Sequence, residues 1–153
     1  MIIREGAAAM ALLEVRSRTV GVPGGPAVPA VWLEVAAAET GAGGGGGDGD
    51  ALTLREIVRR AVRAQFTAAG SAGGVQAESE ARRSVGAQFR ADRERAEPVG
   101  DAAAEEERAL AAVGGGLVAV FMGGRRLECL DEQVPVREGD RITFLRLTAL
   151  AGG

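Results

Sequence analysis

Hydrophobic and charged residues alternate in two segments near the start of the chain. In LLEVRSRTV (12–20) the apolar side chains fall on one side of an extended backbone, and the charged ones fall on the other. The segment VWLEV (31–35) repeats this alternation. A period of two predicts half-buried strands. Because the Pro- and Gly-rich stretch 21–30 between them is short, the two strands are expected to form an antiparallel hairpin.

A helical period follows in TLREIVRRAVRAQF (53–66), where apolar residues recur three and four positions apart. Thr53 stands where an N-cap is expected. The arginines of this segment are expected on its exposed side, and they are Arg55, Arg59, Arg60 and Arg63. We interpret them as a solvated face, because no basic excess elsewhere and no interleaved aromatic residues indicate nucleic-acid binding. The preceding GAGGGGGDGD (41–50) lacks the Lys and Ser/Thr of a phosphate-binding loop and is predicted to be a linker.

The block 67–113 differs from its surroundings in charge. Six arginines against nine acidic residues give it a net charge of −3, which is the net charge of the whole chain. TAAGSAGG (67–74) is predicted to be a loop, whereas 75–97 and 101–113 have high helix propensity. Pro98 separates these two segments. The block is therefore expected to be an insertion, a loose helical pair attached to a neutral core.

The last forty residues again favour strands. LVAVFM (117–122) is a buried strand by length and β-branched content, and Gly123-Gly124 is a hairpin turn signal. RRLECL (125–130) follows as a short strand. Its alternation places Cys129 on the side of Leu127, so we interpret Cys129 as a small core residue rather than a reactive thiol.

RITFLRL (141–147) is predicted to be the last strand, after a connection that ends in the turn 138–140. Ile142 and Phe144 share one face of this strand. Thr143, Leu145 and Leu147 share the other.

Composition narrows the chemistry. The chain has no His and a single Cys, which excludes His-dependent triads and argues against an enzyme and against a thiolate metal site. All 18 basic residues are Arg, so the chain has no side-chain amine of its own. No apolar run approaches a membrane span, and the N-terminus does not fit a signal peptide. We expect a cytoplasmic protein, with 1–9 as a flexible extension and either Met1 or Met10 as the start.

The sequence ends in Gly152-Gly153, a few residues after the last predicted strand. Glycines without Cβ atoms leave a carboxylate unhindered in a narrow channel. In a chain with 24 glycines, a glycine pair alone says little about function, but the segment before it strengthens the interpretation. LVAVFMGGRRLECLDEQVPVREGDRITFLRLTALAGG (117–153) resembles the second half of ubiquitin. It is also similar to the sulfur carriers of molybdopterin and thiamine synthesis.

This resemblance implies an α+β fold, the β-grasp, with one helix packed on a mixed sheet and the last strand in the middle. Together with the first hairpin and the helix at Thr53 it covers about two-thirds of the chain. The single domain would span 10–153, with a helical or disordered insertion at 67–113 and a flexible tail at 148–153. The insertion has no counterpart in the compact family members, and the longer tail is closer to that of ubiquitin. A bacterial-type ubiquitin-like protein modifier is therefore our first interpretation.

The resemblance also implies a mechanism in which the protein is a substrate rather than an enzyme. A partner activating enzyme would use ATP to adenylate the Gly153 carboxylate, and the acyl group would pass to a thiol and then to an amine on a target. Conjugation would involve Gly152 and Gly153, while Ala149, Leu150 and Ala151 would thread the channel of the partner. A possible docking face consists of Thr143, Leu145 and Leu147.

Two alternatives stay open. The first is a sulfur carrier, in which sulfide captures the acyl adenylate as a C-terminal thiocarboxylate for cofactor biosynthesis or tRNA thiolation. The second is a β-grasp interaction domain that is never conjugated. In each case we expect no bound cofactor or metal. The expected partners are the adenylating enzyme, a conjugating enzyme and target proteins, and neither nucleic acid nor membrane.

Overall fold

The computed structural model describes residues 10–20, 28–36, 52–94 and 97–147. These residues form an α+β fold with a mixed five-stranded sheet, a small second sheet and three α-helices. The strands are β1 (Met10–Val20), β2 (Val31–Ala36), β3 (Leu52–Thr53), β4 (Val118–Met122), β5 (Arg125–Leu127), β6 (Gln133–Val134) and β7 (Arg141–Leu147). The helices are α1 (Leu54–Gly70), α2 (Val75–Ala87) and α3 (Ala102–Gly114), with a 3-10 turn at Asp92–Glu94.

The five-stranded sheet has the order β2-β1-β7-β4-β5. The β1–β2 hairpin is antiparallel, as predicted. The last strand, β7, lies in the centre, parallel to β1 and antiparallel to β4, so the expected central position is confirmed. The parallel register pairs Val15 with Ile142 and Ser17 with Phe144. The central strand β7 and its neighbour β1 therefore come from opposite ends of the chain.

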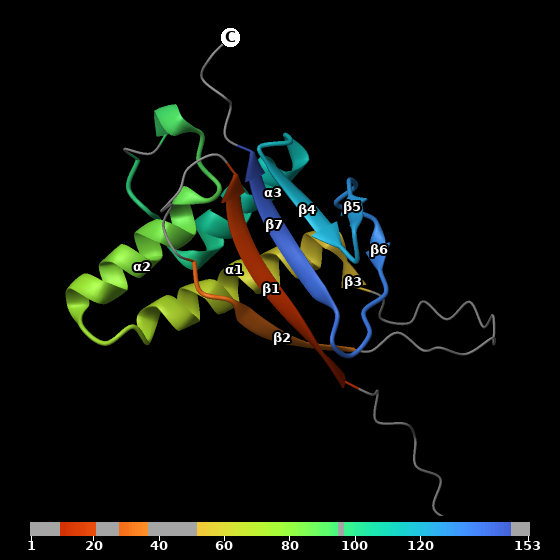
Figure 1. Ribbon diagram of the computed structural model, residues 1–153. Helices are drawn as coiled ribbons and strands as arrows, with labels where there is room; N and C mark the ends of the chain where they lie inside the picture. The colour runs from red at the N-terminus through yellow and green to blue at the C-terminus, as the bar shows by residue number, and fades with distance from the viewer. Residues whose placement is uncertain (1–9, 21–27, 37–51, 95–96, 148–153) are drawn as a thin grey trace, which may run out of the picture.

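All three helices lie on one face of the sheet, which we call the inner face (Figure 1). Helix α1 begins where predicted, because the Thr53 hydroxyl accepts a hydrogen bond from the Glu56 amide at 3.3 Å. It continues to Gly70, so the predicted loop at 67–74 is wrong in its first half. Ala69 is buried in the last turn, and this packing extends the helix beyond the weak local signal.

The insertion was expected to be either helical or disordered, and it is helical. It is not a loose helical pair, because its helices pack on the core. Phe89, Ala109 and Leu110 are buried in the same hydrophobic cluster as the strands and α1. Helix α3 also pairs with the arginine side of α1: Arg63 contacts Glu106 at 2.8 Å, and Arg59 contacts Glu107 at 3.4 Å. The arginines of α1 nevertheless keep side chains between 40% and 69% exposed, so their predicted exposure is confirmed, and the acidic residues of α3 pair with two of them.

The hairpin between β4 and β5 forms as predicted. Gly123 and Gly124 both have positive φ, at 58° and 79°, as a two-residue turn requires. The second strand, however, ends at Leu127 instead of residue 130. The strand alternation therefore stops before Cys129, which is exposed, and its assignment to the core was wrong.

The connection before β7 contains a pairing that the sequence did not indicate. Strand β6 pairs with β3, just before α1, to make the second sheet. The predicted turn at 138–140 is confirmed: the Asp140 amide donates to the Arg137 carbonyl at 3.0 Å, and Gly139 has a φ of 86°. The Glu14 amide then donates to the Asp140 carbonyl at 3.0 Å, which places the start of β7 beside β1.

Candidate functional site

The described part of the candidate site is β7 and the sheet face around it. The predicted conjugation residues Gly152 and Gly153, and the channel residues Ala149, Leu150 and Ala151, lie outside the described residues. The predicted Gly-rich linker 41–50 and the predicted extension 1–9 also lie outside the described residues. Strand β7 is described to Leu147, so the point from which the chain continues toward Gly153 is known.

Thr143 and Leu145 lie on the sheet face opposite the helices, which we call the outer face. Both are half-buried, whereas Ile142 and Phe144 of the same strand are buried on the inner face. The register places Phe121 beside Thr143 and Ala119 beside Leu145. The predicted docking residues Thr143 and Leu145 thus share an apolar strip with β4. Leu147 continues β7, but its side chain is outside the description.

Arginines from β1 border this strip. Arg16 pairs in register with Thr143, and Arg18 pairs with Leu145. Both arginines are exposed, and the Arg18 side chain makes no hydrogen bond or ion pair with any residue that the structure describes. A shallow hollow opens beside them. It is lined by Arg16, Ser17, Arg18, Val28, Ala30, Arg141 and Thr143. This edge of the strip is therefore basic.

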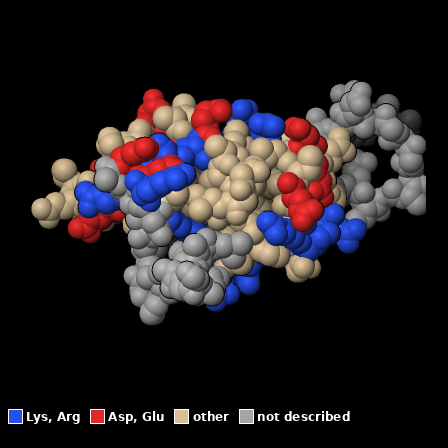
Figure 2. Space-filling view, turned by 90° about the horizontal axis from the view of Figure 1, so that it is seen from above, with Lys and Arg blue, Asp and Glu red and all other residues tan. Residues whose placement is uncertain are grey.

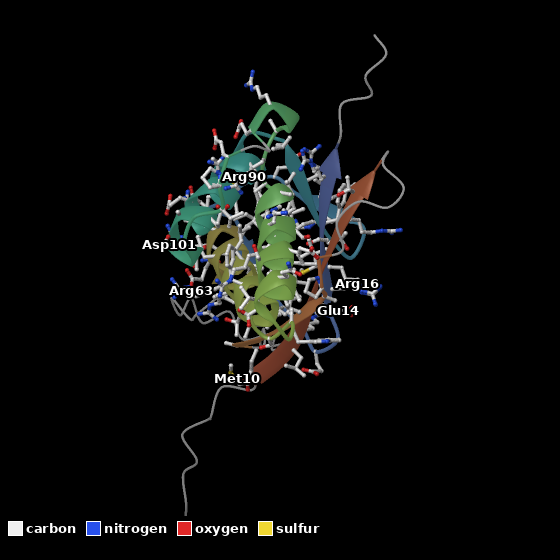
Figure 3. All side chains as sticks on the ribbon, turned by 90° about the vertical axis from the view of Figure 1, so that its left-hand side faces the viewer. Met10, Glu14, Arg16, Arg63, Arg90 and Asp101 are labelled. Atoms are coloured by element: carbon white, nitrogen blue, oxygen red, sulfur yellow. The ribbon has the colours of Figure 1, made fainter. Side chains whose placement is uncertain are left out.

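Glu14 lies on the outer face (Figure 3), where its carboxylate contacts both Arg16 and Arg141. Arg16 Nε donates to Glu14 Oε1, and Arg141 Nε donates to Glu14 Oε2 at 3.3 Å. The hydrogen bond from Arg16 is the main reason that the pKa of Glu14 lies below its ordinary value, and Arg141 adds to the effect. Glu14 stays ionised, and it neutralises part of the charge that Arg16 and Arg141 present.

The outer face also carries large exposed apolar side chains on its β1–β2 side. Trp32 is 57% exposed, and Met10 and Leu12 are about half exposed. The register places Trp32 beside Glu14. The sequence alternation already contained this signal, because a strand with Val31, Leu33 and Val35 inward must direct Trp32 outward. The alternation in β1 likewise directs Arg16 and Arg18 outward, but it did not indicate that they belong to the candidate site.

Charge is mixed on the end of the molecule where β7 finishes. Figure 2 looks onto this end and shows basic and acidic side chains side by side around an uncharged area. Within the insertion, Arg108 contacts Glu94 at 2.8 Å and also contacts Glu97. These pairs raise the pKa of Arg108 against the opposing effect of its burial.

Two further features of the described residues bear on the site. They contain no group of three or more His, Cys, Asp or Glu side chains placed to hold a metal ion. No helix among them has the length and apolar character that crossing a bilayer requires.

Comparison with known proteins gives no relative. The chain matches no protein-family model, no curated protein and no solved structure.

Proposed function

We propose that the protein has a β-grasp fold and acts as a ubiquitin-like modifier, activated at the carboxylate of Gly153. One observation carries the proposal. The last strand lies at the centre of the sheet, parallel to β1, and the diglycine follows a few residues after its end. The order β2-β1-β7-β4-β5, with the three helices of the described residues on one face, supports the β-grasp assignment.

The chemistry runs through the chain as a substrate. The Gly153 carboxylate attacks the α-phosphorus of ATP, the bond to the departing diphosphate breaks, and an acyl adenylate forms on the partner enzyme. A partner thiolate then attacks the acyl carbon and releases AMP, which gives a thioester. An amine of the target attacks this thioester, loses a proton, forms the amide and releases the thiolate. No step needs a general base from this chain.

The outer face supplies a docking surface for the activating enzyme in this proposal. In the apolar strip, Thr143, Leu145 and Phe121 are half-buried and provide area that a partner can desolvate, whereas Ala119 is already buried. Arg16 and Arg18 border the strip. The strip lies on the same strand that leads to the diglycine. An enzyme that binds it would therefore hold the tail close to its own active site.

Mass spectrometry of the protein from its native host tests the function. The intact mass first establishes whether Gly153 carries the free carboxylate. Covalent adducts of higher mass, with Gly153 in an amide to a target amine, are expected for a modifier. An exchange of oxygen for sulfur at the terminus would instead identify a sulfur carrier, and an unmodified chain throughout would identify the interaction domain.

Reconstitution with the activating enzyme provides the matched comparison. Deletion of Gly153 is expected to abolish ATP-dependent release of diphosphate, because the remaining terminus is one residue too short for the channel. Gly123→Asn is the control, since Asn tolerates the positive φ of 58° at that turn and lies far from the tail in sequence. Equal activation of both variants would contradict the proposal.

A further inference from the structure

The end of β7 is covered by the insertion. On the inner face the Phe144 ring meets the edge of the Phe89 ring, with centroids 6.1 Å apart and planes at 69°. Two residues further along, Arg146 is only 4% exposed, and its Nη1 donates a hydrogen bond to the Ala87 carbonyl at the end of α2. A charged residue is rarely buried unless it is paired. The last inward-facing side chains of β7 are therefore held by residues 87–89.

The end of α2 is suited to bind arginine. The final carbonyls of a helix have no partner within the helix, and they form the negative end of its dipole. Two guanidinium groups lie there. Arg90 Nη1 donates to the Gly86 carbonyl at 2.8 Å, while Arg146 donates to the next carbonyl, that of Ala87. One cation comes from the insertion itself, and the other comes from β7.

The same helix end is fixed to α3. Arg90 makes a bidentate pair with Glu105, at 2.8 Å and 2.6 Å, and both side chains are almost fully buried. Glu105 Oε1 also accepts a hydrogen bond from the Gly100 amide at 2.9 Å. Arg90 lies between α2 and α3 in Figure 3. Bidentate pairs of this kind restrict geometry as well as adding energy.

A second set of hydrogen bonds fixes the helix end to the sheet and to α1. Ser17 Oγ donates to Gln88 Oε1 at 2.7 Å, Gln88 Nε2 donates to Gln65 Oε1 at 2.6 Å, and Gln65 Nε2 donates to Ser17 Oγ at 3.1 Å. The three side chains form a closed ring between β1, α1 and the C-cap of α2. The carbonyl that Arg146 contacts is therefore part of a fixed framework.

We propose that the insertion at 67–113 is a clamp on the end of β7 and that Arg146 is a positioning residue for the C-terminal chain. Held by Ala87 and flanked by Phe144 against Phe89, Arg146 fixes the place at which the chain leaves the sheet. The functional part of this inference rests on the proposed activation at Gly153: an enzyme docked on the outer face meets a chain that leaves from a constant position.

Hydrogen exchange measured residue by residue tests the clamp without any partner. Arg146→Met keeps an unbranched side chain but removes the charge and the donors. We expect amides at 145–147 to exchange at least tenfold faster, the effect of losing a hydrogen bond to a charged group. Amides at 31–35 in the β1–β2 hairpin should exchange as in the wild type. Arg18→Met, on the exposed outer face, is the matched control and should change neither region.

Phe89→Leu is the second variant, because it reduces the other contact with little change in volume and should fold even where Arg146→Met does not. It is expected to speed exchange at 144–147 more than at 31–35. Equal exchange at both places, or no difference between Arg146→Met and Arg18→Met, would overturn the clamp.

Activation kinetics then separate the clamp from the proposed function. With the activating enzyme, Arg146→Met is expected to lower kcat/KM about tenfold relative to the wild type at equal folded fraction. Faster exchange without any loss of kcat/KM would overturn the positioning role and leave the clamp structural. A wild-type protein that no adenylating enzyme activates would end the proposed function, while the exchange result would still decide the clamp.

Discussion

Glu14 and Glu105 are both buried carboxylates paired with arginine, but their partner arginines differ in exposure. Glu14 lies on the outer face near the start of β7, and its partners Arg16 and Arg141 have side chains 49% and 53% exposed. Glu105 of α3 pairs with Arg90 at the C-terminal end of α2, and these side chains are 2% and 3% exposed. The pKa of each carboxyl is lowered, yet water screens only the first pair.

The difference bears on the two roles proposed above, docking at the outer face and positioning of the end of β7. The pairs around Glu14 can exchange partners, because their arginines are exposed and a binding protein can replace water around them. The pair of Glu105 with Arg90 cannot, because each buried charge is compensated by the other and by backbone groups. The outer face is therefore suited to recognition, and the inner end of β7 is suited to rigidity.

Removal of the buried carboxylate should have the largest effect. Glu105→Ala leaves Arg90 buried without its counter-charge, and we expect it to lower the free energy of unfolding by about 3–5 kcal/mol. That is a large fraction of the usual stability of a domain. Urea unfolding followed by circular dichroism measures it. Glu107→Ala, an exposed α3 residue, is the control, and equal losses in the two variants would contradict the contrast.

Acid should reveal the same contrast without mutation. Burial alone would raise the pKa of Glu105, but the hydrogen bonds from Arg90 and the Gly100 amide outweigh it, so the folded pKa lies below the ordinary value. A carboxyl of this kind contributes its full stability above its unfolded pKa, about 4.3. The contribution is lost as pH falls through the lower folded pKa.

Thermal melts at pH 7 and pH 3 test this directly. The wild type should lose stability between them, and Glu105→Gln should lose measurably less because its amide does not titrate. Glu14→Gln should change the pH dependence in the same direction. A pH dependence in Glu105→Gln equal to that of the wild type would contradict the role of the buried pair.

The aromatic contact comes next in size. Phe89→Leu removes an edge-to-face contact with Phe144 and part of a buried side chain, and we expect a loss of about 1–2 kcal/mol. Differential scanning calorimetry measures it. Phe66→Leu is a matched control, because Phe66 is only partly buried at the edge of the core and should lose less. A smaller loss for Phe89→Leu than for Phe66→Leu would show that the insertion is not tightly packed.

The outer face should show the smallest change in stability. Leu145→Ser shortens a half-buried side chain and is expected to lower stability less than Phe89→Leu, yet to raise KM for the proposed activating enzyme about tenfold. Thermal melts and diphosphate release measure the two effects. Leu12→Ser, exposed on the far side of the same face, is the control. Equal KM values for the two variants would remove the strip from the docking surface.

The sheet was predictable because its signals are local. Alternation located β1, β2 and β7 to within two residues, and the glycine pair located the β4–β5 turn. The central place of β7 came from the resemblance and not from periodicity. Cys129 was misplaced because alternation says which way a residue points only while the strand lasts, and β5 ends two residues earlier.

The packing of the insertion could not be predicted from local sequence signals. Its dense charge of both signs predicted a loose helical pair, since charged helices are usually solvated. The acids of α3 instead pair with Arg59 and Arg63 of α1, and Arg90 and Glu105 are buried together. These are contacts between residues far apart in sequence, and a single chain does not indicate which charges will meet. The burial of Arg146 was missed for the same reason.

The central position of β7 also governs when the fold can form. Arg141 and Glu14 are 127 residues apart in sequence, yet they are neighbours in the sheet. Pairings of such high contact order form slowly, because a long loop must close first. During synthesis, a chain that stops before residue 141 lacks its middle strand and leaves β1 and β4 without a common neighbour. Such incomplete chains should remain open to proteolysis until β7 is made and takes its place between β1 and β4.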